Sequence, residues 1–338
     1  MSIVKQTVFI IGAPRSGTTW LQAMLGAHPA ICTTAELMLF NHYTAQWVDA
    51  WNAQVRLHHD GSFVGLPTLW SEEEFYGFLK EFLDRVYSRV REQKPEAPIL
   101  LDKHPGYAQY VDHIDRLIPT AKFIHIIRDG RDVASSMMAA AKGWARIWAP
   151  QSVEKAAASW KTHTVAARQA ARHEGRYLEM RYEDLLASGV PVMRKVYDFL
   201  GVPMSEEQIA ATLQEHQFEK MKKKKTGASQ FTLPEGFFRQ GGKGDWQATL
   251  NPTQRIIFHE VAGDLLCELG YATDSWWVQH EYQRVMLPAT AFLLNPTRSR
   301  KKMKATLKHL VGPTWLDRIR NIRGALQPKN GKELPENG

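Results

Sequence analysis

The chain has 338 residues, 44% of them apolar, which is enough to bury one large core or two modest ones and excludes an intrinsically disordered protein. Its net charge of +8 is confined to residues 298–338, where eleven Lys and Arg outnumber three acidic residues, while the other 297 residues carry 32 charges of each sign. The body of the chain therefore has no charge excess for binding nucleic acid, and only its tail could contact an anionic surface.

The amino-terminal residues, MSIVKQTVFIIG, lack the apolar length and the cleavage site of a secretory signal, and no run of about 18 apolar residues follows. The two cysteines, Cys32 and Cys267, are too few for a disulfide framework and lack the paired spacing of a metal site. We therefore expect a cytoplasmic protein with reduced cysteines and no bound metal ion.

Residues 7–12 form an apolar run that predicts a buried strand, and residues 18–28 predict the helix that follows. The turn between them, GAPRSG, gathers free backbone N–H groups at the mouth of the helix, where an anion binds. It matches the glycines and the final hydroxyl of the phosphate-binding pattern GxxxxGK[ST], but Thr18 occupies the lysine position. The turn thus lacks the γ-phosphate clamp of a nucleotide hydrolase, and Arg15 supplies a cation from inside it.

Three further apolar runs predict strands, and three stretches with apolar residues three and four positions apart predict helices. The strands are 97–102, 121–128 and 176–181, and the helices are 75–90, 153–171 and 190–201. This alternation predicts an α/β fold with three layers, in which helices flank a central, mostly parallel sheet as in P-loop folds. We expect one domain over residues 1–295 that includes a mobile loop at 222–229, and a basic tail at 296–338.

The segment IIRDGRDVASS, residues 126–136, repeats the order of strand, turn and helix. Arg128 stands at the carboxyl end of the predicted strand, where open α/β sheets bind ligands, and Ser136 lies about two helical turns further on. This pair predicts a second phosphate site. The alternative is that the arginines of the segment pair with its aspartates on a solvated helix start, and the segment alone does not decide between them.

Together these motifs resemble those of the sulfotransferases that use 3′-phosphoadenosine 5′-phosphosulfate (PAPS). The first turn resembles their 5′-phosphosulfate loop, P-[KR]-S-G-T-T-W, and Arg128 with Ser136 resembles their 3′-phosphate motif. RQGGKGDW resembles their third signature, R-K-G-x-x-G-D-W, with Gln240 at the usual lysine, and the resemblance runs in order over residues 7–271. The donor-binding residues that it implies are Pro14, Arg15, Ser16, Gly17, Thr18, Thr19, Trp20, Arg128, Ser136, Tyr182, Phe218, Met221, Phe237, Arg239, Gln240 and Gly241.

The resemblance implies an enzyme that transfers a sulfuryl group in line from PAPS to a hydroxyl, phenol or amine, with 3′-phosphoadenosine 5′-phosphate (PAP) as product and no metal ion. Gln240 gives up a positive charge near the 3′-phosphate, which Lys243 or the lysines at 222–225 would replace. Arg15 would neutralise the leaving oxygen rather than donate a proton. The alternative functions are a donor-binding protein without transferase activity and a P-loop kinase, and Thr18 argues against the kinase.

Two residues compete to remove the proton of the acceptor. Glu36 lies where carbohydrate and protein-tyrosine sulfotransferases carry a glutamate base, and Lys103 lies at the place of their lysine. His104 resembles the histidine of cytosolic small-molecule sulfotransferases, and histidine suits a base near neutral pH. We favour Glu36 because the sequence around it follows the carbohydrate and protein-tyrosine pattern. Both residues also have structural alternatives, as a helix cap for Glu36 and an ordinary hydrogen-bonded histidine for His104.

Two tryptophan pairs, Trp47 with Trp51 and Trp144 with Trp148, have a four-residue spacing that is equally typical of a helix on a core and of an apolar acceptor pocket. The tail places apolar residues near one helical face and arginines elsewhere, so it could contact an anionic membrane or pack on the protein's own surface. The sequence leaves open the oligomeric state and whether the acceptor is a small molecule, a lipid or a carbohydrate.

Overall fold

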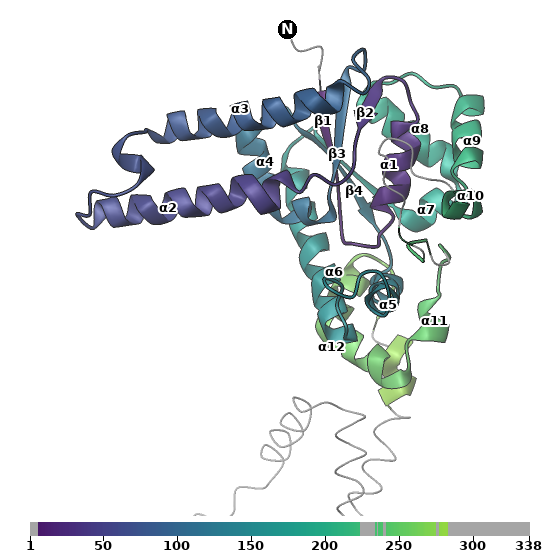
Figure 1. Ribbon diagram of the computed structural model, residues 1–338. Helices are drawn as coiled ribbons and strands as arrows, with labels where there is room; N and C mark the ends of the chain where they lie inside the picture. The colour runs from purple at the N-terminus through teal and green to yellow at the C-terminus, as the bar shows by residue number, and fades with distance from the viewer. Residues whose placement is uncertain (1–5, 224–233, 235, 239–240, 275–276, 283–338) are drawn as a thin grey trace, which may run out of the picture.

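The computed structural model describes residues 6–223, 234, 236–238, 241–274 and 277–282 (Figure 1). Within these residues, five parallel strands form one sheet in the order β2-β3-β1-β4-β5. The strands are β1 Gln6–Ile11, β2 Ile31–Thr33, β3 Ile99–Lys103, β4 Lys122–Ile127 and β5 Tyr177–Arg181. The predicted strands are therefore confirmed. Sequence analysis missed β2, because its three residues are too few to show a period.

The helices of the described residues follow the predicted alternation. Their bounds are α1 Thr18–Gly26, α2 Ala45–His59, α3 Glu72–Arg91, α4 Val111–Leu117, α5 Gly130–Ala141, α6 Val153–Arg168, α7 Tyr182–Ala187, α8 Gly189–Leu200, α9 Glu206–Glu215, α10 Phe218–Lys223, α11 Trp246–Thr249 and α12 Pro252–Glu268. A π-helix, η1 Phe40–Thr44, precedes α2, and the 3₁₀ helices are η2 Leu66–Thr68, η3 Pro105–Tyr110 and η4 Gln169–Arg172. The four predicted helices correspond to α1, to α3, to α6 with η4, and to α8.

The sheet is covered on both faces, because alternate residues of each strand point to opposite sides. Phe9 and Ile11 of β1 pack in one buried cluster with residues of α3, α4 and η3. Val8 and Ile10 pack in another with residues of α1, α8 and α9. A third cluster joins α5, α6, α11 and α12 beside the end of β4. The three-layer α/β fold predicted from the sequence is confirmed.

The sheet register decides where the functional segments meet. β1 lies between β3 and β4, with Ile10 opposite Lys103 and Ile11 opposite His125. Parallel strands end at a common edge, so the turns that follow β1, β3 and β4 are neighbours. These turns contain the predicted phosphate loop, the candidate base His104 and the predicted phosphate ligand Arg128.

Helices α2 and α3 extend together away from the sheet (Figure 1). A capping box of Ser71 and Glu74 starts α3, and Trp51 of α2 stacks on Phe75 with ring centroids 4.4 Å apart. Trp51 is buried in the core, so the core interpretation holds for Trp51, and Trp47 is half-buried against the same cluster. The helical interpretation is wrong for Trp144 and Trp148, which lie in consecutive turns after α5.

None of the helices in the described part of the chain combines the length and the apolar character that a membrane-spanning segment needs. The predicted mobile loop at 222–229 begins inside α10, which ends at Lys223, and the rest of that loop lies outside the described residues. The domain boundary at 295 and the tail at 296–338 also lie outside them. The cytoplasmic location and the membrane contact of the tail stay predictions.

Candidate active site

The loop between β1 and α1 has the backbone of an anion-binding turn. Gly17 is the N-cap of α1 with a φ of 100°, and a Cβ atom there would lie 2.6 Å from the ring of Tyr182. Arg15 has a φ of 73°, a conformation that only a few per cent of non-glycine residues adopt. Strain of this kind persists only where the surrounding structure holds it, and it clusters at functional sites.

Several hydrogen-bond donors around this loop are left for a ligand. Helix α1 begins without a side-chain cap, so its first N–H groups keep their partial positive charge. Ser16 and Arg128 are both buried, and neither the hydroxyl of Ser16 nor Nε of Arg128 has a hydrogen-bond partner among the described residues. Buried donors normally have partners, so these unmatched groups fit a bound anion such as a phosphate or a phosphosulfate.

Arg15 joins the three predicted donor-binding segments. Its Nε donates to Oγ of Ser136 at 3.2 Å, and a terminal nitrogen donates to the carbonyl of Phe237. Its guanidinium carbon lies 4.6 Å from the ring centroid of Phe237 and 5.4 Å from that of Trp144. Sequence analysis placed Arg15 at the leaving oxygen, a role that stays a prediction. In the structure its guanidinium lies beside the serine of the second phosphate motif.

Arg128 contacts the phosphate loop, the third signature and Tyr182. Its terminal nitrogens donate to the carbonyls of Arg15 at 3.2 Å and Gly242 at 2.9 Å, and its guanidinium carbon lies 4.4 Å from the ring centroid of Tyr182. The Tyr182 hydroxyl donates to the carbonyl of Gly241 at 2.8 Å. Arg128 therefore holds the phosphate loop and the third signature together, and within the described part of the chain it forms no ion pair with Asp129 or Asp132.

The alternative of a solvated helix start is wrong for this segment. Arg131 does pair with Asp129, at 2.7 Å, but both side chains are buried. Asp132 accepts hydrogen bonds from the backbone N–H groups of Gly244 at 2.8 Å and Trp246 at 2.9 Å. The two acidic residues thus build the site, because they fix the start of α5 and attach the third signature to it.

The other predicted donor-binding residues surround these contacts. Trp20 donates from its indole N–H to the carbonyl of His216 at 2.7 Å, and Met221 is buried in the same apolar cluster as Trp20 and Tyr182. Thr18 is buried and Pro14 is half-buried in the loop. The side chain of Phe218 and the residues Arg239 and Gln240 lie outside the described part of the chain. Their donor contacts, like that of Met221, stay predictions.

The three remaining catalytic candidates lie together at the end of β3. Lys103 is 2% exposed, and its Nζ donates to Oγ1 of Thr19 at 3.1 Å and to Oε1 of Glu36. Oε2 of Glu36 lies 3.6 Å from Nε2 of His104. The Glu36 side chain remains 35% exposed, so an acceptor can reach its carboxylate. Lys103 thereby connects the phosphate loop to the candidate base.

The hydrogen bonding of His104 bears on the choice between the two candidate bases. Its Nδ1 accepts from the backbone N–H of Gly106 at 3.1 Å, so a neutral ring carries its proton on Nε2, the nitrogen that faces Glu36. Burial lowers the pKa of His104 to about 4. In this arrangement the lone pair of Nδ1 is taken by Gly106 and Nε2 carries the proton, so the neutral ring has no free lone pair to receive a proton from an acceptor.

Sequence reasoning missed Gln22, which lies on α1 and holds the segment before Glu36. Its Nε2 donates to Oγ1 of Thr33 at 2.9 Å and to the carbonyl of Thr34 at 2.7 Å. The available signal was a buried amide within the otherwise apolar run TTWLQAML. Trp144 was also left undecided, and it proves to lie beside Arg15.

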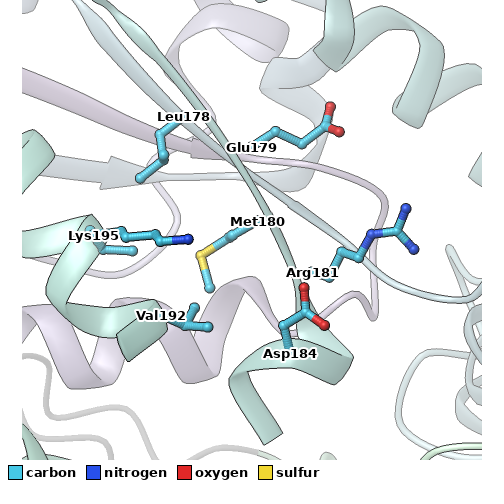
Figure 2. A pocket seen from close by; sticks show the side chains of 8 residues that line it. Leu178, Glu179, Met180, Arg181, Asp184, Val192 and Lys195 are labelled. Carbon is cyan, nitrogen blue, oxygen red and sulfur yellow. The ribbon is translucent and has the colours of Figure 1, made fainter. Parts of the chain in front are cut away.

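A cavity of about 90 Å³ lies apart from these residues, between β5 and α8 (Figure 2). It is lined by Leu178, Glu179, Met180, Arg181, Asp184, Val192, Lys195 and Val196. Small-molecule sites usually have volumes of about 300–1,000 Å³. The cavity is too small for a nucleotide, and none of the predicted site residues lines it.

Comparison with known proteins agrees with this geometry. A sequence profile of the sulfotransferase family matches residues 7–206. Human protein-tyrosine sulfotransferase 1 is 33% identical over 134 residues, which are 39% of this chain and 33% of the human protein. The Drosophila melanogaster protein-tyrosine sulfotransferase is 26% identical over 204 residues, 59% of this chain and 38% of the fly protein. The match covers less than half of the length of each of these relatives.

The fold is also that of a solved sulfotransferase. The crystal structure of a mouse sulfotransferase complexed with PAP superimposes with a TM-score of 0.53 at 19% sequence identity, covering 79% of this chain and 89% of the mouse chain. At this identity the likeness concerns the fold alone. The family profile covers more than half of the chain, so the resemblance noted in the sequence is confirmed. The chain belongs to the sulfotransferase family.

Proposed function

We propose that the protein transfers a sulfuryl group from PAPS to a hydroxyl or phenol, with Glu36 as general base. The observation that carries this proposal is the position of Lys103, whose ammonium contacts both Thr19, in the first turn of α1 after the phosphate loop, and the carboxylate of Glu36. A transferase needs its donor site and its base within reach of one reacting atom. A protein that only bound the donor would have no need for this connection.

The residues present fit the donor. The unmatched hydroxyl of Ser16, the N–H groups at the start of α1 and the hydroxyl of Thr19 would hold the 5′-phosphosulfate. Arg128, with its unmatched Nε, and Ser136 would hold the 3′-phosphate. The bound donor supplies a sulfuryl group on a phosphate that is a good leaving group. This chemistry explains why Thr18 can stand at the position where a nucleotide hydrolase carries lysine.

The contacts of Glu36 indicate how the acceptor proton is removed and how the charge on the leaving phosphate is stabilised. Its carboxylate takes the proton of the acceptor hydroxyl as the acceptor oxygen bonds to sulfur and the bond from sulfur to the 5′-phosphate oxygen breaks. The electron pair of that bond stays on the phosphate. Protonation of Glu36 weakens its ion pair with Lys103. The positive charge of the Lys103 ammonium, which also donates to Thr19 beside the loop, is then available to stabilise the negative charge on the leaving phosphate. Arg15 adds a second cation to stabilise the leaving phosphate.

The acceptor class is part of the proposal. The relatives named as protein-tyrosine sulfotransferases support a phenol, while the exposed carboxylate of Glu36 gives room for a larger acceptor. We therefore propose a phenol as the preferred acceptor, ahead of lipid and carbohydrate hydroxyls. Nucleic acids are not among the proposed acceptors or partners.

Two assays test the function. Calorimetry should detect PAP binding, whereas ATP with Mg²⁺ should bind more weakly; the reverse order would favour the P-loop kinase. Radiolabelled PAPS should then transfer label to at least one of four probes: 2-naphthol, an acidic tyrosine peptide, an oligosaccharide and a fatty alcohol. PAP binding without transfer to any of them would favour a donor-binding protein without transferase activity.

A further inference from the structure

The position of Glu36 is not set by a helix or a strand. Residues 34–38, between β2 and η1, have no regular secondary structure, and Met38 has a φ of 56°, in the left-handed region that non-glycine residues rarely adopt. A catalytic carboxylate on such a segment needs fixed points on either side, because a shift of about 1 Å can cost a hundredfold in rate. We call residues 34–39 the Glu36 segment.

The first fixed point is at Thr34. Gln22 of α1 donates from one amide nitrogen to the hydroxyl of Thr33 and to the carbonyl of Thr34. Gln22 lies four residues after Thr18 on the helix that follows the phosphate loop, so the segment starts at a fixed place relative to that loop.

The second fixed point is at Leu39. The backbone N–H of Leu39 donates to the hydroxyl of Tyr107 at 2.9 Å, and this hydroxyl donates its own proton to Oδ2 of Asp102 at 3.2 Å. Tyr107 is 0% exposed, and Asp102 and Leu39 are buried. Because Asp102 takes the hydroxyl proton, a lone pair of the Tyr107 oxygen is left for Leu39.

The end of β3 therefore reaches Glu36 by two routes. Lys103 contacts the Glu36 carboxylate, and the preceding Asp102, whose side chain points to the opposite side of the strand, reaches the backbone of the segment through Tyr107. Neither Asp102 nor Tyr107 belongs to the residues that contact the donor or the acceptor in the proposed reaction.

We propose that Gln22, Tyr107 and Asp102 are positioning residues that fix the Glu36 segment at both of its ends and so place the general base. This inference rests on the proposed function only for the predicted effect on kcat. The two fixed points themselves are contacts within the chain and can be tested without a donor or an acceptor.

The chain offers a matched control in Tyr87. Its hydroxyl donates to the same Oδ2 of Asp102 at 2.9 Å, and its ring is also buried, but it comes from α3 and, in the described part of the chain, makes no hydrogen bond with the Leu39 backbone. Tyr87→Phe and Tyr107→Phe each remove one buried hydroxyl from the same carboxylate. Only Tyr107→Phe leaves the Leu39 N–H without an acceptor.

The first experiment is hydrogen–deuterium exchange of the Glu36 segment, followed by peptide mass spectrometry in the full chain. Tyr107→Phe should accelerate exchange at Leu39 by at least about tenfold, and Tyr87→Phe should leave it unchanged. Equal exchange in the two variants would overturn the second fixed point, whatever the activity of the protein.

The second experiment measures kcat with the probe acceptor that gives the highest turnover. Tyr107→Phe should lower kcat by about 10- to 100-fold, with the KM for PAPS and the Kd for PAP unchanged, while Tyr87→Phe should stay within about twofold of the wild type. Gln22→Leu should show the same kcat loss, and it tests the proposal if Tyr107→Phe does not fold. Equal kcat values in all three variants and the wild type would overturn the positioning role. A wild type without turnover but with the predicted exchange would instead overturn the proposed function.

Discussion

The ammonium of Lys103 donates a hydrogen bond to the hydroxyl of Thr19 at 3.1 Å, although the two residues are 84 positions apart in the chain. Thr19 lies in the first turn of α1, directly after the loop with the unmatched donors, and Lys103 also contacts Glu36. The parallel register of β1 and β3 brings the two together, because Lys103 lies opposite Ile10, just before the loop. This contact is the shortest connection between the proposed donor site and the proposed base.

Replacing Lys103 tests that connection. Lys103→Met keeps an unbranched side chain but removes the charge, and we expect kcat to fall by about a hundredfold to a thousandfold, as when a single oxyanion donor is lost. The matched control is Lys122→Met, which removes a partly buried lysine of β4 that donates to the carbonyl of Phe199. Steady-state kinetics at saturating PAPS measure the effect. Similar kcat values for the two variants would contradict the role of Lys103.

Replacing Trp144 tests the contact with Arg15. The guanidinium of Arg15 lies over the rings of Trp144 and Phe237, and cation–π contacts contribute about 0.5–2 kcal/mol. Trp144→Leu should therefore weaken PAP binding by about 2- to 30-fold in calorimetry. Trp148→Leu is the control, since Trp148 is 53% exposed. An equal loss in both variants would point to the fold of the turn rather than to Arg15.

The conformation of the phosphate loop can be tested at Gly17. Gly17→Ala adds a Cβ atom against the Tyr182 ring, whereas Gly61→Ala, at a φ of 89°, meets nothing within 4 Å. Both variants carry the cost of a left-handed residue, about 1–2 kcal/mol in unfolding experiments. Only Gly17→Ala should also abolish PAP binding, because the ring contact forces the loop to move. PAP binding by Gly17→Ala at wild-type affinity would refute the described loop geometry.

The pH dependence of stability tests the burial of Asp102. Burial raises the pKa of Asp102 from 3.8 to about 6, so the folded protein holds this proton more tightly than the unfolded chain. Its contribution to stability is therefore complete below about pH 4 and is lost as the pH rises through about 6. Asp102→Asn does not titrate, and its carbonyl oxygen can still accept from both tyrosines.

We expect the free energy of unfolding of Asp102→Asn, relative to the wild type, to increase by up to about 3 kcal/mol between pH 4 and pH 7. Urea unfolding at several pH values measures this difference. A difference that stays constant with pH, or that changes in favour of the wild type, would show that Asp102 is not buried as described.

Local sequence patterns were enough to predict the main strands, the phosphate loop and the α/β fold, because these depend on apolar periodicity and on glycines at a turn. The family resemblance supplied Lys103, Glu36 and His104 as candidates, whereas their proximity emerges only in the folded chain. Contacts between distant segments could not be predicted. Arg15 and Ser136 are 121 positions apart, and their contact depends on the β1–β4 register and on the start of α5. The Asp102–Tyr107–Leu39 chain likewise depends on side-chain directions that only the folded chain defines.

The most direct test of the central claim is the pH profile of kcat for Glu36→Gln and His104→Asn beside the wild type, with labelled PAPS and the same acceptor. We predict a loss of about 10²- to 10⁴-fold for Glu36→Gln, a smaller loss for His104→Asn, and PAP affinity unchanged in both. Because the pKa of His104 is lowered to about 4, the pH profiles of kcat for the wild type and His104→Asn should have the same shape near pH 6.5. Near-normal turnover by Glu36→Gln, together with a step in kcat near pH 6.5 that is present in the wild type and absent from His104→Asn, would contradict the assignment and make His104 the base.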